Sequence, residues 1–229
     1  MRGHFGGWAA LALAISLATP TSPVLAQAAI GEQTPAAYLK LIAEMRASGR
    51  PRAALAHLDA FEVKNPKDNA ARLLRADCLV DVQQYAAARQ VYDGLIKSPY
   101  GAAAWAGLGR ISALEGDWIA AATGFGEAVK REPINAAYIG DLGFALLRAG
   151  DVQAALFRLR QAGELAPDSS TVRNNLILAL EADSQAAAAR RLLDQVKDPK
   201  EREEIAAMRR ELARSAAEGA KDEDQRKPG

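Results

Sequence analysis

The chain has 229 residues, of which 49% are hydrophobic and 25% are charged, a composition typical of a soluble globular or repeat protein. Its formal net charge is only +1, so no basic excess favours nucleic acid or anionic lipid as a partner. The single cysteine, Cys78, excludes an intramolecular disulfide. Because the adjacent Leu79 and Val80 are apolar, we expect Cys78 to be a buried small hydrophobic residue rather than a reactive thiol.

Residues 1–26 have the three-part layout of a cleavable secretory signal. Arg2 gives a weakly positive start, and the apolar run Trp8–Ala18 is too short to span a bilayer comfortably. Val24-Leu25-Ala26 then places small or modest residues before a cleavage point. We therefore expect export to the periplasm with cleavage after Ala26, no membrane span after cleavage, and a linker at residues 27–34. An N-terminal anchor that stays uncleaved is the alternative.

Two later stretches, Leu108–Pro133 and Leu142–Pro167, agree at few positions, and these positions are all 34 residues apart. The agreements pair leucines, glycines, aspartates, alanines and prolines: Leu108/Leu142, Gly109/Gly143, Gly116/Gly150, Asp117/Asp151, Ala121/Ala155, Ala128/Ala162 and Pro133/Pro167. The period extends in both directions. It predicts five units, at about 35–68, 69–101, 102–135, 136–169 and 170–200.

Each unit is predicted to form a pair of amphipathic helices. In residues 136–169, apolar side chains recur at helical spacing on both sides of a break at Gly150. Gly150 can adopt the positive φ that ends a first helix, and Asp151 can cap the start of the second. Gly143 and Ala155 are small, which lets the two helix backbones approach closely where they cross.

The third unit contains the fullest set of residues that are diagnostic of the tetratricopeptide repeat (TPR) family, whose unit is a 34-residue helix pair. These residues are Trp105, Leu108, Gly109, Gly116, Ala121, Phe125, Ala128 and Pro133. The chain resembles this family over about three quarters of its length. The resemblance implies an all-α fold, a right-handed α-solenoid of about five TPR helix pairs. Departures at Arg72 and Arg75 in the second unit, and at Ile177 in the fifth, predict looser packing of those two pairs.

After the fifth unit, residues 201–217 are predicted to form a polar C-terminal helix with a single apolar stripe of Ile205, Met208 and Leu212. Such a stripe is typical of a helix that caps the exposed core of a last repeat. Residues 218–229 are polar and mixed in charge, and we expect them to be a disordered tail.

The sequence offers little for catalysis. His4 and His57 are the only histidines, and no metal-ligand spacing, clustered-carboxylate pattern or G-x-S-x-G motif is present. We therefore expect no enzymatic activity, no cofactor and no metal, with an enzyme kept as a remote alternative.

In the TPR family, the first helix of each unit lines a concave groove that binds an extended peptide or a partner helix. The resemblance therefore implies a scaffold with a protein or peptide ligand in this groove. The positions carried over by register are Leu39, Ala43, Arg46, Leu73, Asp77, Asp81, Ala106, Arg110, Leu114, Gly140, Phe144, Arg148, Asn174, Leu178 and Glu181. The lysine and asparagine set of a chaperone-tail clamp is missing, so we expect an apolar groove with scattered charges. The simpler interpretation of Arg110 and Arg148 is that they are only solvated.

The segment Thr171–Val196 contains the pair Asn175-Leu176 and is followed by a helix with the sequence AAMRREL. It resembles the last repeat and tail of the TPR proteins of tight-adherence (Flp-type) pilus assembly. This resemblance implies an assembly factor with pilus or secretin components as partners, in the periplasm or at the inner face of the outer membrane. The lipid-attachment cysteine of many members is missing here. A general periplasmic TPR adaptor, in envelope maintenance or cell division, is the alternative.

Export predicts that the periplasmic form of the protein begins near Gln27, because signal peptidase cleaves after small residues such as Ala26. N-terminal sequencing of the protein purified from a periplasmic extract should read from Gln27. Recovery of an intact Met1 in the membrane fraction would instead establish the uncleaved anchor.

Overall fold

The computed structural model describes residues 34–225. The predicted signal at residues 1–26 and nearly all of the predicted linker lie outside the described residues. The chain divides into two units, residues 1–38 and 39–229. The described part of the first unit is the start of one helix, and the second unit holds all the helices that follow.

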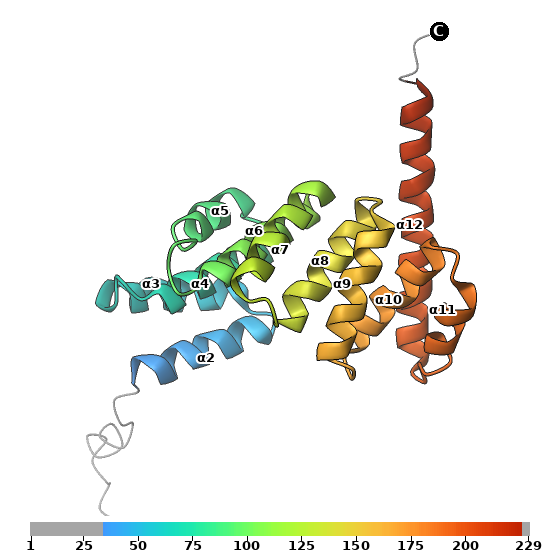
Figure 1. The fold of residues 1–229 in the computed structure, drawn as a ribbon. Helices are drawn as coiled ribbons and strands as arrows, with labels where there is room; N and C mark the ends of the chain where they lie inside the picture. Colours follow the sequence, from blue (N-terminus) through green and yellow to red (C-terminus); the bar gives the residue numbers. More distant parts are fainter. Residues whose placement is uncertain (1–33, 226–229) are drawn as a thin grey trace, which may run out of the picture. The chain divides into compact units, whose positions relative to one another are not determined.

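Within the described residues the chain is entirely helical and contains no strand (Figure 1). The helices are α2 (Pro35–Ala47), α3 (Pro51–Lys64), α4 (Asn69–Asp81), α5 (Tyr85–Asp93), α6 (Gly101–Leu114), α7 (Trp118–Arg131), α8 (Ala136–Arg148), α9 (Val152–Leu165), α10 (Ser170–Ala182), α11 (Ala186–Leu193) and α12 (Pro199–Gln225). They form five consecutive pairs, from α2/α3 to α10/α11, followed by α12. The predicted all-α fold of about five helix pairs with a C-terminal helix is confirmed.

The turns inside the third and fourth helix pairs are formed by the glycine and aspartate residues expected there from the sequence. Gly116 and Gly150 have φ values of +83° and +88°, a left-handed conformation that costs glycine little and that ends α6 and α8. The side chains of Asp117 and Asp151 then accept hydrogen bonds from backbone N–H groups three residues further on, at 2.9 and 3.1 Å. Each aspartate therefore caps the helix that follows it.

The second and fifth pairs depart from the common pattern. Gln83 and Ser184 take positive φ values of 63° and 59° at turn positions where the other pairs have glycine. Arg75 of α4 forms an ion pair with Glu62 of α3 at 3.0 Å, and Ile177 of α10 is fully buried. The fold therefore accommodates the arginine through charge pairing and the isoleucine inside the core.

The paired helices approach closely where glycine lies at their crossing. A Cβ on Gly124 of α7 would lie 2.7 Å from the Cα of Gly109 on α6, so the two backbones leave no room for a side chain. A Cβ on Gly143 of α8 would lie 2.7 Å from Cγ of Leu159 on α9, and Ala155 of α9 is fully buried. The predicted role of Gly143 and Ala155 at the helix crossing is confirmed.

The core runs through the helix pairs as three clusters of buried side chains. One cluster is shared by α4, α5 and α6, another by α7 to α10, and a third by α8 to α12. Ile205 of α12 is fully buried in the third cluster, and Met208 and Leu212 pack against it. The helix continues to Gln225, beyond residue 217 where the cap was expected to end. Glutamate, alanine and lysine in this stretch favour helix, which explains why residues 218–225 are helical here.

The contact between Gly124 and Gly109 predicts that Gly124→Ala destabilises the fold. The added methyl group would meet backbone atoms that cannot rotate away, so we expect the free energy of unfolding to fall by about 1–3 kcal/mol. Urea denaturation followed by circular dichroism measures this change.

Gly126→Ala is the matched control in the same helix, because a Cβ there would meet nothing within 4 Å. It should leave stability unchanged or raise it by up to about 1 kcal/mol, since alanine is the better helix former. Equal losses in the two variants would contradict the close crossing of α6 and α7.

Candidate functional site

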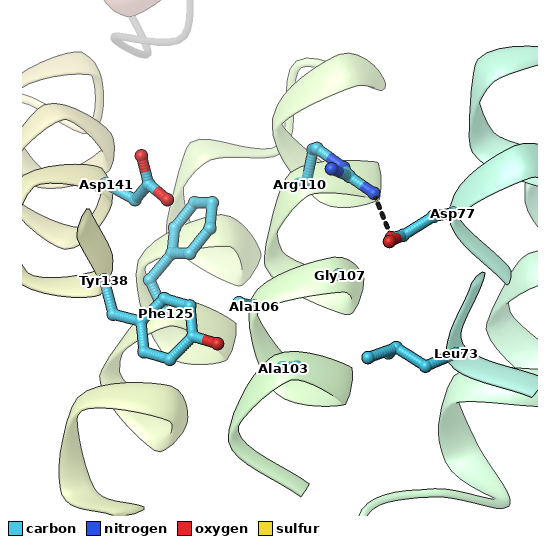
Figure 2. Close-up of a pocket in the computed structure, with 9 residues that line it drawn as sticks. All are labelled: Leu73, Asp77, Ala103, Ala106, Gly107, Arg110, Phe125, Tyr138 and Asp141. Carbon is cyan, nitrogen blue, oxygen red and sulfur yellow. Dashed lines mark hydrogen bonds and ion pairs between the residues drawn. The ribbon is translucent and has the colours of Figure 1, made fainter. Parts of the chain in front are cut away.

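A pocket of about 280 Å³ opens among α4, α6 and α8, which are the first helices of three consecutive pairs (Figure 2). Phe125 of α7, the second helix of the third pair, also reaches it. The lining residues are Leu73, Asp77, Ala103, Ala106, Gly107, Arg110, Phe125, Tyr138 and Asp141. Both apolar and charged groups therefore face the same hollow.

The floor of the pocket is open because α6 carries very small residues there. Ala103, Ala106 and Gly107 follow one another along the helix face that meets the hollow. A Cβ on Gly107 would lie 2.3 Å from the ring of Tyr92, which belongs to α5 and is fully buried behind it. Glycine at position 107 is thus required by the packing of α5 on α6, behind the pocket.

A network of ion pairs and hydrogen bonds forms one side of the pocket. The carboxylate of Asp77 accepts hydrogen bonds from the Tyr92 hydroxyl at 2.6 Å and from Arg110 Nη2 at 2.7 Å. Arg46 of α2 lies 3.4 Å from the same carboxylate and donates to Asp81 at 2.6 Å. Burial, together with the charge of Asp77, raises the pKa of the Tyr92 phenol, so its hydroxyl remains a donor. The two arginines and two aspartates of this network balance each other in charge.

Asp141 lies on the other side of the pocket, on α8. It has no hydrogen-bond or ion-pair partner among the described residues. The residue keeps contact with solvent, yet the surrounding groove walls desolvate its carboxyl and raise the pKa to about 6, against the opposing effect of Arg110. In Figure 2 the rings of Phe125 and Tyr138 lie on the Asp141 side, while Arg110 points to Asp77. Asp141 is therefore the one charge of the pocket that the described chain leaves unbalanced.

The structure brings together several of the residues predicted for the groove. Leu73, Asp77, Ala106 and Arg110 line the pocket, while Arg46 and Asp81 join it through the ion-pair network. Leu39 is half-buried on α2, and Leu114 is 55% exposed at the end of α6; neither lines the pocket. Whether these side chains contact a partner stays a prediction.

Tyr138 and Asp141 were not among the residues predicted for the groove, and Phe125 was expected only as a diagnostic residue of the repeat. One signal was present in the sequence. Asp141 is the single charged residue in the otherwise apolar and small run AAYIGDLGFALL, which forms most of α8. A lone acid in such a helix indicates a position that faces water or a ligand.

The predicted groove residues of the fourth and fifth pairs contact other side chains instead of the pocket. The Arg148 guanidinium lies 4.1 Å from the ring centroid of Trp118, which packs edge-on against Phe144 at 5.9 Å. Arg148 also pairs with Glu211 of α12 at 2.8 Å. The alternative that Arg148 is only solvated is therefore wrong, because its side chain is just 10% exposed.

The C-terminal helix α12 also forms ion pairs with α10. Glu181 accepts a hydrogen bond from Arg209 at 2.7 Å, and Arg173 pairs with Glu201 at 2.6 Å. Asn174 and Leu178 are only 6% and 2% exposed, so they offer little surface to a partner. Gly140 is also buried, against Val172 of α10.

Groups suited to metal or nucleophilic chemistry do not gather in the described part of the chain. No cluster of three or more histidine, cysteine, aspartate or glutamate side chains there could hold a metal ion. Cys78 is fully buried, and burial raises the pKa of its thiol to about 11. Its predicted role as a small buried hydrophobic residue is confirmed. No helix among the described residues is both long and apolar enough to cross a membrane.

A family model described as "Tetratricopeptide repeat" matches residues 44–101 and 79–137 of the chain. The matched part of the chain, residues 44–137, is therefore similar to tetratricopeptide repeats. The TPR repeat-containing protein PA4299 of Pseudomonas aeruginosa is 28% identical to it over 160 residues. That match covers 69% of this chain and 63% of PA4299, so the chain spans less than two thirds of its relative's length.

Solved structures show the same fold at low sequence identity. TTC0263, a TPR protein of Thermus thermophilus, aligns with a TM-score of 0.59 and 22% identity over 76% of this chain and 97% of its own. MamA of Desulfovibrio magneticus RS-1 aligns with a TM-score of 0.56 and 18% identity over 81% and 97%. YrrB, described as a TPR protein with an unusual peptide-binding site, aligns with a TM-score of 0.52 and 14% identity over 76% and 90%. Together the comparisons support a TPR-like helical fold for this chain.

The hydrogen bonds of Asp77 predict that Asp77→Asn destabilises the protein more than Asp81→Asn. Asp77 accepts from the fully buried Tyr92 and from two arginines, whereas Asp81 is paired with Arg46 and its side chain is 33% exposed. We expect losses of about 2 kcal/mol for Asp77→Asn and below about 1 kcal/mol for Asp81→Asn in urea denaturation. Equal losses would mean that the network is too solvated to stabilise the fold.

Proposed function

We propose that this protein is an exported TPR scaffold that binds an extended segment of a partner protein in the pocket between α4, α6 and α8. The observation that carries this proposal is the pocket itself. It is lined by consecutive first helices, it contains both apolar and charged groups, and the described residues leave it open.

The chemistry of the lining fits a protein segment better than a small polar ligand. Leu73, Ala103 and Ala106 give apolar surface for a side chain, and Asp141 and the Tyr138 hydroxyl can hydrogen-bond a backbone or a polar group. The side chains come from three helix pairs, so a ligand that follows the groove meets successive repeats. TPR scaffolds bind proteins in this general way.

We further propose that the partner belongs to a tight-adherence (Flp-type) pilus or a related secretion system. Support comes from the likeness of Thr171–Val196 and the following helix to the last repeat and tail of the TPR proteins of those systems. The signal-like residues 1–26 support an exported location, where such an apparatus is assembled.

The groove can be tested by filling it with a large side chain. In a strain that lacks the gene, plasmid-borne wild-type protein should restore surface pili, counted by electron microscopy. Ala103→Trp should fail to do so, because an indole at position 103 would occupy the pocket. Ala86→Trp is the matched control, since Ala86 is exposed on α5 and does not line the pocket.

Circular dichroism and immunoblotting should show that both tryptophan variants are helical and equally abundant. Normal piliation in the deletion strain would reject the pilus role and favour a general periplasmic adaptor. Full restoration by Ala103→Trp would move the partner site away from this pocket.

A further inference from the structure

The charged side chains of the pocket differ in whether they have an ion-pair partner. Asp77 accepts hydrogen bonds from Tyr92 and Arg110 and is paired with Arg46, which also holds Asp81. Both arginines are thus turned toward aspartates of the chain itself. Asp141 has no partner among the described residues, so the pocket has an unbalanced negative charge.

Aromatic rings stand beside this unpaired carboxylate. Phe125 and Tyr138 line the pocket on the same side as Asp141, as Figure 2 shows; Phe125 is only 7% exposed, and Tyr138 is half-buried. An aromatic wall next to a carboxylate suits a side chain that has a long apolar stem and a cationic end. Lysine and arginine have this form, and their stems pack on apolar surface while their charge meets an acid or a ring face.

We propose that the pocket binds a lysine or arginine side chain of the partner segment, with its stem along Phe125 and Tyr138 and its charged end at Asp141. This inference rests on the proposed function, since it names the partner chemistry that the same groove recognises. An acidic side chain is excluded from this position, because it would face Asp141 while Arg46 and Arg110 are already paired.

The charge state of Asp141 makes this recognition dependent on pH. Its carboxyl has a raised pKa of about 6, so it is ionised at pH 7.5 and takes up a proton as the pH falls through that value. The ionisable groups that act on it are Arg110 on α6 and Tyr138 on α8, while Asp77 on α4 lies across the pocket, next to Arg110. Arg110 stays cationic and Tyr138 stays neutral, because both have raised pKa values, and Asp77 is held by ion pairs. Protonation of Asp141 therefore removes the charge that attracts the cation, and binding weakens below about pH 6.

A random dodecapeptide library displayed on phage provides a probe that assumes no partner. Peptides selected on the purified wild-type protein should be enriched in lysine or arginine at one position. In fluorescence anisotropy, replacing that residue by norleucine should weaken binding roughly tenfold at pH 7.5. Asp141→Asn should weaken binding of the unmodified selected peptide (the parent peptide) by a similar factor. The Asp141→Asn variant should bind the norleucine peptide no more weakly than it binds the parent peptide.

Asp168→Asn is the matched control, because it removes the same charge from an exposed position outside the pocket. It should bind both peptides as the wild type does. The parent peptide should also lose affinity for the wild type between pH 7.5 and pH 5, while its affinity for Asp141→Asn should stay nearly constant.

Ala103→Trp separates this inference from the proposed function. Suppose that Ala103→Trp abolishes binding, but that the losses of affinity caused by Asp141→Asn and by the norleucine replacement simply add. The groove would then bind peptides without a cation site at Asp141, and the inference would be overturned. If peptides bind Ala103→Trp unchanged, the pocket is not the binding site and both proposals fall. Selection of no peptide by the wild-type protein also counts against both.

Discussion

The groove depends on the contact between the ring of Tyr92 and the backbone of Gly107. The ring is fully buried, and it occupies the space that a Cβ at position 107 would need. Because α6 keeps a glycine there, α5 can pack closely against α6 behind the groove. The Tyr92 hydroxyl then reaches Asp77, which in turn holds Arg110. One aromatic side chain of a second helix thus sets the close packing of α5 on α6 and takes part in the charge network of the pocket.

This arrangement separates the groups that hold the groove together from those that are free for a ligand. Arg46, Asp77 and Arg110 bind one another across three consecutive first helices, so most of their interaction energy is already committed in the unbound protein. Asp141 has no such partner within residues 34–225, and its carboxyl is partly desolvated by the groove walls. A charge of this kind gains more from an incoming cation than one that must first break an existing ion pair.

The 34-residue period was sufficient to predict the helix pairs, the turns at Gly116 and Gly150, and the close packing of Gly143, because each depends on local backbone geometry. The pairing of Asp77 with Arg110 was not predictable, since it depends on how adjacent first helices lie across from each other. Asp141 was missed for a related reason. The groove residues were predicted from fixed repeat positions on each first helix. On α8 the pocket is instead lined by Asp141, which lies outside those positions and across from the small residues of α6. The contact of Arg148 with Glu211, which are 63 residues apart, likewise depends on packing and not on the repeat.

Helix α8 connects the pocket with the part of the predicted groove where side chains contact one another. Its first half carries Tyr138 and Asp141 into the pocket, and its last turn carries Arg148, which Trp118 and Glu211 hold. Contacts from α7 and α12 therefore fix the end of the same helix that positions the unpaired acid. A carboxylate on a helix restrained in this way loses little conformational freedom when a cation binds, which raises affinity without adding any contact. The C-terminal helix therefore does not line the pocket, but it contacts the end of the helix that carries Asp141.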